Sequence, residues 1–345
     1  MDNQDVKKLC LDLIHADREE QVVQILKERG FGDDRRYWRH YGDEEANWGR
    51  AGNQQQRADY ALNEKLVNAV DSRLMLECML AGISPESDEA PGSMREAVNR
   101  FIEKTWSGHL KVSGGRTEEW PPNYRTQVAK SISVFVTGPK GSKPCINIAD
   151  IGEGQMPEAF PETLLSLGRK NKISVKFVQG KFGQGSTGAA RFCGEEKLQL
   201  IVSRRHPELL GGKVVSSAYP VHDTDDYWGF TIIRREGEGN IRSPFLSYLA
   251  PLDALEPGQG RKGRILRFEA AEMDLFPQGH TAYRHTATYG TLVKLYEYKL
   301  KHDSHILRGG GLRSRIDLLL PEPALPMRFH ECRGHFKKAR SKRKP

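Results

Sequence analysis

The hydrophobic pattern of this chain changes its period once, and that change restricts the folds it can adopt. In the first third of the chain, apolar residues recur at helical spacing, most clearly from Asp59 to Leu80. From residue 131 onward the period is two, since Ile132, Val134 and Val136 alternate with polar residues. Helices followed by alternating strands predict an α+β protein, a two-layer sandwich whose mostly antiparallel sheet is covered by helices on one face.

Turn residues and capping patterns divide the rest of the chain into expected elements. The residues from Gly138 to Ser142 predict a turn that joins strand 132–136 to a strand at 146–148. Asp17 with Glu20 predicts the start of a helix. The other expected strands are 198–204, 229–235, 264–269 and 291–297. The helices expected besides 59–80 are 17–29, 93–106 and 158–167, whereas 31–57 and 107–126 are expected to be irregular.

The positive charge of the chain is concentrated at its C-terminal end. The formal net charge is +8, and the last ten residues contain six Lys or Arg and no acid, so the rest is nearly neutral. Such a run is either a solvated tail or an electrostatic contact for nucleic acid or another polyanion. The five cysteines are scattered without a CxxC pair, which favours reduced thiols and a cytoplasmic location. We expect no signal peptide and no membrane span, because no apolar run is long enough.

Three polar residues form a stripe along the predicted helix 59–80. Glu64, Asn68 and Asp71 are four and three residues apart, so they share one helix face. Apolar residues flank the stripe on both sides, as expected for polar groups that line a cleft. Taken alone, the same spacing also suits a solvated helix surface.

Two motifs that contain glycine follow the predicted hairpin. Asp150, Gly152 and Gly154 come at the end of its second strand, where a carboxylate can accept a hydrogen bond from an exocyclic amine and glycines permit close approach. A plain turn is the alternative. The segment from Gly180 to Gly188 offers free backbone N–H groups for a phosphate. It is neither a dinucleotide fingerprint nor a P-loop, because it lacks the βαβ unit and the closing Gly-Lys-Ser/Thr.

The three motifs, in this order, resemble those of the GHKL ATPase superfamily, whose nucleotide pocket is called the Bergerat fold. The resemblance covers about Asp59 to Tyr296, and Gly290-Thr291 is similar to the late Gly-Thr strand of that superfamily. Around Lys172 the sequence is similar to the lid of the Microrchidia and heat-shock chaperone branches and to bacterial members. The resemblance implies ATP and Mg²⁺ as ligands.

The resemblance also implies chemical roles for five side chains. Glu64 would be the general base that orients water toward the γ-phosphate, and Asn68 would coordinate Mg²⁺ through its amide oxygen. Asp71 would bound the pocket near the ribose and adenine, or else brace the helix. Asp150 would accept a hydrogen bond from the adenine amine, with Thr291 beside it.

Backbone contacts and a lid complete the implied site. Gly152 and Gly154 would allow the backbone to approach the adenine. Residues 155–182 would form a mobile lid, from which Lys172 or Lys170 could reach a phosphate. The implied phosphate loop comprises Gly183, Gln184, Gly185, Ser186, Thr187 and Gly188.

On this interpretation the chain has three parts. Residues 1–58 are an N-terminal helical and irregular extension, residues 59–300 are the ATP-binding domain with an insertion at about 81–130, and residues 301–345 are a C-terminal extension with the basic tail. About 50 residues follow Thr291, too few for the transducer domain that supplies a catalytic lysine in gyrase. The resemblance therefore implies ATP binding more directly than hydrolysis.

The expected function is that of a Mg²⁺-dependent ATP hydrolase whose lid closure acts as a conformational switch, in a DNA-related or defence context. Members of the superfamily often dimerise when ATP closes the lid, so a nucleotide-dependent homodimer is expected. The basic tail adds nucleic acid as a candidate partner, and no membrane partner is expected. The alternatives are a nucleotide-binding regulatory module without hydrolysis, a polyanion-binding accessory protein and a protein kinase.

Overall fold

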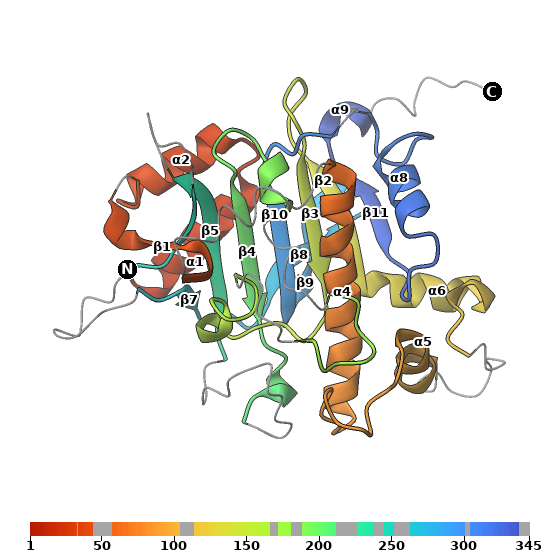
Figure 1. The fold of residues 1–345 in the computed structure, drawn as a ribbon. Helices are drawn as coiled ribbons and strands as arrows, with labels where there is room; N and C mark the ends of the chain where they lie inside the picture. Colours follow the sequence, from red (N-terminus) through yellow and green to blue (C-terminus); the bar gives the residue numbers. More distant parts are fainter. Residues whose placement is uncertain are drawn as a thin grey trace, which may run out of the picture.

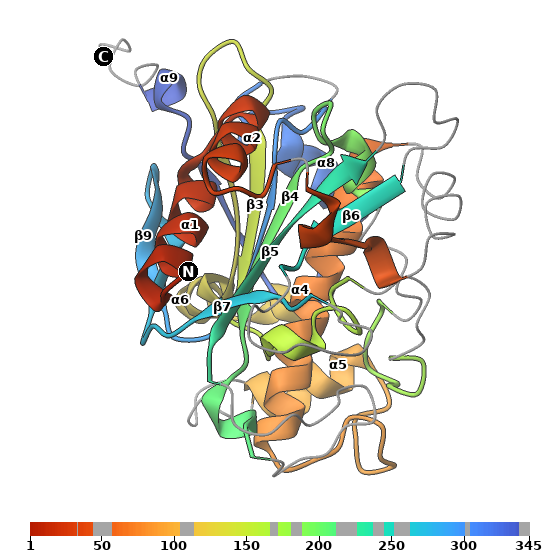
Figure 2. The same ribbon diagram turned by 90° about the vertical axis from the view of Figure 1, so that its left-hand side faces the viewer.

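One large mixed sheet with helices on both of its sides organises the molecule (Figures 1 and 2). The computed structural model describes residues 1–32, 34–43, 57–103, 114–165, 172–180, 188–211, 226–236, 245–251, 263–300 and 304–337. The α-helices are α1 (Asn3–His15), α2 (Glu19–Glu28), α4 (Ala58–Leu80), α5 (Met94–Ala97), α6 (Pro122–Val128), α8 (Leu312–Leu319) and α9 (Gly334–Lys337). A π-helical turn spans Val98–Ile102, and 3₁₀ turns span Arg35–Tyr37, Tyr41–Asp43, Thr117–Glu119, Ala129–Ser131, Pro157–Ala159, Ala190–Phe192 and Pro207–Leu209.

The strands of the large sheet are antiparallel, except that its last two neighbours run parallel. Their spatial order is β1 (Trp38–His40), β6 (Phe245–Leu249), β5 (Trp228–Glu236), β4 (Gln199–Arg204), β10 (Gly290–Leu295), β3 (Cys145–Asp150), β2 (Ile132–Thr137) and β11 (Arg328–Glu331), with β7 (Leu266–Phe268) also paired to β5. β11 is the parallel partner of β2. A separate hairpin consists of β8 (Met273–Gln278) and β9 (Thr281–Ala287).

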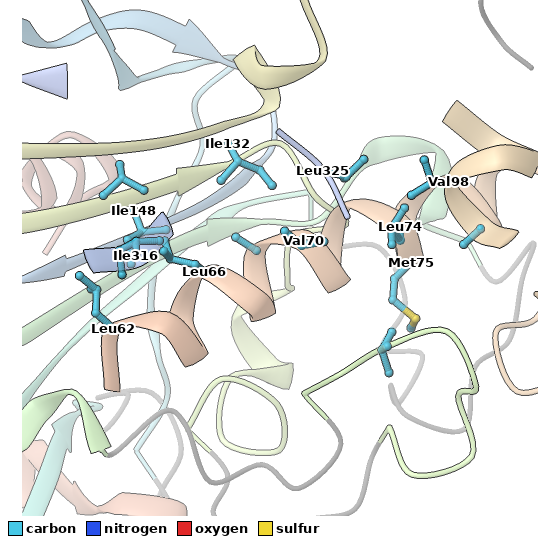
Figure 3. Packing of buried hydrophobic residues seen from close by; sticks show 14 of the residues in the cluster. Leu62, Leu66, Val70, Leu74, Met75, Val98, Ile132, Ile148, Ile316 and Leu325 are labelled. Atoms are coloured by element: carbon cyan, nitrogen blue, oxygen red, sulfur yellow. The ribbon is translucent and has the colours of Figure 1, made fainter. Parts of the chain in front are cut away.

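The long helix α4 covers one face of the sheet. Its apolar side presents Leu62, Leu66 and Val70, one turn apart, to Ile132 of β2 and Ile148 of β3 (Figure 3). Burial of each such side chain contributes about 1.5–3 kcal/mol. Residues of α5 and α8 belong to the same hydrophobic cluster. The polar side of α4 is left to face the segments that follow β3.

A second layer covers the opposite face, so the expectation of helices on one face only is wrong. The alternation within β2 shows both faces, because Val134 packs in the α4 cluster whereas Phe135 packs with α1 and α2. The β8–β9 hairpin joins this second layer. Lys294 of β10 is fully buried here, and its Nζ donates to the Ile14 carbonyl at 2.8 Å and to Asp17 Oδ1 at 2.9 Å.

The elements with strong local signals agree with the sequence-based predictions. The long helix is α4, and it ends just before a glycine with a φ of 77°, Gly82. The predicted hairpin is β2–β3, and the four other predicted strands correspond to β4, β5, β7 and β10. Among the described residues, no helix is both long and apolar enough to cross a bilayer.

Four local predictions are wrong, the first being the irregular segment 31–57, which contains the strand β1 (Trp38–His40). Helix α2 begins at Glu19, and Gln21 rather than Glu20 caps it, since its Oε1 accepts the N–H groups of Asp17 and Arg18. The predicted helix at 158–167 is a 3₁₀ turn followed by further turns in its described part. Residues 122–128, expected to be mostly irregular, form α6, because Pro122 at the first helical position fixes a suitable φ.

Candidate functional site

The polar stripe of α4 meets the segment that leads into the glycine-rich loop. Asp71 is fully buried, and its two carboxylate oxygens accept the backbone N–H groups of Gln179 at 3.1 Å and Gly180 at 2.8 Å. A Cβ at Gly180 would lie 2.4 Å from Oδ1 of Asn68, so a larger residue here would require the Asn68 side chain to move. Asp71 thus holds the segment 172–180 on α4. Glu64 and Asn68 are half-buried on the same helix face.

The apolar residues of segment 172–180 strengthen this attachment. Val175, Phe177 and Val178 are buried and belong to the α4 hydrophobic cluster. Lys172, at the start of the segment, is half-buried, and its charge acts on both Asp71 and Asp150. Lys170 lies outside the described residues. The predicted lid therefore ends in a segment that is packed on α4.

Asp150 ends β3 as a buried carboxylate. Its Oδ1 accepts the N–H of Gly152 at 2.9 Å, and no other described residue donates a hydrogen bond to it. Burial is the main reason that the pKa of Asp150 is raised from its ordinary 3.8 to about 7; the Gly152 N–H opposes this rise, and the nearby charge of Glu153 contributes to it. A buried carboxylate with one hydrogen bond retains acceptor capacity for a ligand.

The glycines after Asp150 are needed for contacts within the protein. A Cβ at Gly152 would lie 2.1 Å from Oγ of Ser72 on α4. A Cβ at Gly154, which has a φ of 61°, would lie 1.7 Å from the carbonyl oxygen of Arg204 on β4. These glycines let the turn fit between α4 and β4. The sequence-based prediction explained the glycines by the approach of an adenine and did not include this packing.

Thr291 lies directly beside Asp150 in the sheet. The two residues are paired in register between β10 and β3. The Thr291 hydroxyl lies 2.8 Å from Oγ of Ser203 on β4, and that Oγ also accepts the N–H of Gln155 at 2.9 Å. Asp150 and Thr291 are 141 residues apart in sequence, yet the sheet order brings them to the same end of adjacent strands.

Five of the six predicted phosphate-loop residues, Gly183, Gln184, Gly185, Ser186 and Thr187, lie outside the described residues. Gly188 is described and is buried, at the start of the turn that leads to Ala190–Phe192. The structure therefore describes both ends of the predicted loop. Its first end, at Gly180, touches Asn68 and Asp71 of α4.

Several polar residues that the sequence-based predictions did not include hold the Asp150 turn. Glu153 donates its N–H to the Ser72 carbonyl at 3.2 Å, and its carboxylate forms a buried ion pair with Arg205 at 3.0 Å. Ser203 links this region to Thr291. The signal that could have found them is the position of Glu153 inside the Asp150 motif, because an acid in a tight glycine turn at a buried strand end needs a partner.

Comparisons with known proteins do not assign this chain to a family. It matches no protein-family model, and no curated protein matches it.

Proposed function

We propose that this protein binds ATP with Mg²⁺ in a pocket of the Bergerat type and hydrolyses it. The observation that carries the proposal is the buried Asp150 carboxylate, paired across the sheet with Thr291 and left with acceptor capacity. A carboxylate in this state selects a ligand group that donates hydrogen bonds, such as the exocyclic amine of adenine. The order of the motifs along the chain, which resembles that of GHKL ATPases, supports the same conclusion.

The contacts of α4 support a phosphate-binding role for the segment after Gly180. Asn68 offers an amide oxygen, a hard ligand of the kind that Mg²⁺ prefers. The loop from Gly180 to Gly188 begins against this amide, so phosphates held by the loop would lie beside a metal held by Asn68. Mg²⁺ would supply charge neutralisation at the phosphates. Glu64, one turn before Asn68, would orient the attacking water.

Nucleotide binding would act as a switch through the packed lid segment. Asp71 and three apolar residues hold segment 172–180 on α4. A nucleotide that inserts beside this segment changes its contacts, and thereby a surface that a second copy of the chain would recognise. The proposed assembly is a homodimer that forms with ATP.

Calorimetric titration of MgATP tests the binding site. Asp150→Ala and Asn68→Ala are each expected to weaken ATP binding about 10- to 100-fold, because each removes a hydrogen bond or ligand to a charged or buried group. The matched controls are Asp274→Asn on the β8–β9 hairpin and Asn123→Ala on α6, both exposed. Absence of ATP binding by the folded wild-type protein would refute the proposal.

Phosphate release separates an ATPase from a regulatory module that only binds the nucleotide. Glu64→Ala is expected to keep ATP binding and lose turnover by about 100-fold or more. If the wild-type protein binds ATP but releases no phosphate, the function without hydrolysis is the correct one.

A further inference from the structure

Three consecutive residues at the end of β4, Arg204, Arg205 and His206, contact the turn that follows Asp150 and the turn that precedes Thr291. β4 is the neighbour of β10 in the sheet (Figure 1), and the turn after Asp150 packs against the backbone of β4. All three residues are buried, each with 8% of its surface exposed. Buried charged residues in succession are uncommon and require partners.

Arg205 holds the turn that follows Asp150. Its Nη1 donates to Oε2 of Glu153 at 3.0 Å and to the carbonyl oxygen of Gly154 at 3.1 Å. The ion pair is buried, with side-chain exposures of 9% for Arg205 and 2% for Glu153. Because the guanidinium bonds both a side chain and a backbone carbonyl, it fixes the path of the turn between Asp150 and β4.

Arg204 holds the turn that precedes Thr291. Its Nη1 donates to the carbonyl oxygen of Thr288 at 2.9 Å, three residues before Thr291. The same nitrogen donates to two further carbonyls, at Ala270 and Ala271. Its other nitrogens form a two-point ion pair with Asp226 at 2.7 and 2.8 Å. This guanidinium therefore ties the start of β10 to the neighbouring loops.

His206 contacts both turns at once. Its backbone N–H donates to the carbonyl oxygen of Glu153 at 2.9 Å. Its ring lies 4.1 Å from the ring of Tyr289, edge to face, immediately before Gly290. His206 therefore contacts both the turn that follows Asp150 and the turn that precedes Thr291.

We propose that Arg204, Arg205 and His206 are positioning residues that fix Asp150 relative to Thr291, so that the pocket selects adenine over guanine. This inference rests on the proposed function. The ionised Asp150 carboxylate accepts a hydrogen bond from the amine of adenine, whereas guanine places a carbonyl oxygen at the same ring position and would be repelled. Selection of this kind requires the carboxylate to stay in one place. If the turn were mobile, the carboxylate could reorient and accept a hydrogen bond from the other donor groups of guanine.

Selectivity between MgATP and MgGTP, measured by calorimetry at pH 8, where the Asp150 carboxyl with its pKa of about 7 is ionised, tests the inference. Removing Arg205 alone would leave Glu153 buried without it, so the test variant replaces both partners, Arg205→Met with Glu153→Met. The wild-type protein is expected to favour ATP by about 100-fold, and the double variant by less than about 5-fold. A selectivity unchanged in the folded double variant would overturn the inference.

A second buried ion pair provides the matched control. Glu331 and Arg333 are bonded at 2.8 Å with side-chain exposures of 1% and 2%, and they lie at β11, at the far edge of the sheet. Glu331→Met with Arg333→Met removes the same charges and is expected to keep the wild-type selectivity. If this control loses selectivity to the same extent, general loosening explains the effect and the inference is wrong.

A milder variant covers the case in which the double variant does not fold. His206→Ala keeps both ion pairs and removes the ring that contacts Tyr289, together with the hydrogen bond that its Nδ1 accepts from the Glu208 N–H, and it is expected to lower selectivity about 3- to 10-fold. Unchanged selectivity in this variant would then overturn the inference. Wild-type protein that binds ATP and GTP equally would overturn the inference alone, whereas wild-type protein that binds neither would overturn the proposed function as well.

Discussion

Buried charged side chains on the two faces of the sheet differ in how many hydrogen-bond partners they have. On the α1–α2 face, Lys294 donates to a carbonyl and a carboxylate and lies 5.5 and 5.2 Å from the ring centres of Tyr283 and Tyr296. On the same side, the Glu19 carboxylate accepts three backbone N–H groups between residues 195 and 198. At the α4 face, Asp150 is as buried as Glu19 but accepts one hydrogen bond.

This difference separates structural charges from a charge that can serve a ligand. A buried charge with a full set of partners is satisfied within the fold and has no hydrogen-bonding capacity left for a ligand. A buried charge with few partners costs stability, and such a cost is typical of functional sites. The comparison therefore predicts that variants on the two faces change stability in opposite directions.

The largest effect is expected from Lys294→Met. The change leaves the Ile14 carbonyl and Asp17 without their cationic partner, so the free energy of unfolding is expected to fall by about 3–5 kcal/mol. Denaturant titration followed by far-UV circular dichroism measures it. Lys130→Met, at an exposed position, is the control and is expected to change it by less than about 0.5 kcal/mol. A small effect at Lys294 would mean that the α1–α2 face is not held by this contact.

Asp150→Asn is expected to act in the opposite direction. The unfolded carboxyl has a pKa near 3.8 and the folded one about 7, so folding takes up a proton between these values. The free energy of unfolding of the wild type therefore falls as pH rises through this window, and the substitution removes that fall. At pH 8 the variant is expected to be more stable than the wild type by about 4 kcal/mol, and at pH 4 the difference should shrink to less than about 1 kcal/mol.

Denaturant titrations across pH 4 to 8 check this prediction, with Asp274→Asn as the exposed control. The variant should unfold with a flatter pH dependence than the wild type. If it is instead less stable at pH 8, the Asp150 carboxylate has a structural role and the contrast between the faces fails.

Glu19→Gln is expected to lower stability by about 2 kcal/mol, because the amide would point an N–H₂ group at backbone N–H donors. Hydrogen exchange of the N–H groups of Glu195, Glu196 and Leu198 should be faster in the variant, which locates the change. Glu20→Gln, the next residue of α2, is exposed and serves as the control. Equal exchange in the two variants would contradict the structural role of Glu19.

The smallest effect is expected from Asp71→Asn, which weakens the hydrogen bonds that hold segment 172–180 on α4. The amide can accept from only one of the N–H groups of Gln179 and Gly180, so local opening should become easier by about 1 kcal/mol. Hydrogen exchange of these two groups is expected to increase about 5-fold, while global stability changes little. If exchange is unaffected, the apolar contacts of segment 172–180 alone hold it in place.

Local sequence patterns predicted the elements that local interactions determine. The helix α4 and the β2–β3 hairpin were predicted because their apolar periods are long and their turns contain glycine. Helix α1 was missed although Val6, Leu9 and Leu13 recur at helical spacing, so the signal was present. The second layer over the sheet was missed because residues 1–58 were taken for an extension, and a sequence does not show which face a distant segment will cover.

The candidate site shows the same limit. Asp150, Gly152 and Gly154 were found because they are adjacent in sequence, and Thr291 because of the resemblance. The ion pair of Arg205 with Glu153 joins residues 52 positions apart, and no local pattern predicts which arginine will meet which acid. Contacts of this kind depend on the strand order, which the sequence left open.

The contact between Lys294 and Ile14 has a consequence for how the chain is made. The two residues are 280 positions apart, so at about 5–20 residues per second a ribosome adds Lys294 roughly 15–60 s after Ile14. During that interval the sheet that α1 and α2 cover is incomplete, since β10 is the central strand that joins β4 to β3. Nascent chains are therefore expected to need chaperone protection early, and N-terminal fragments that stop before β10 should aggregate when they are expressed alone.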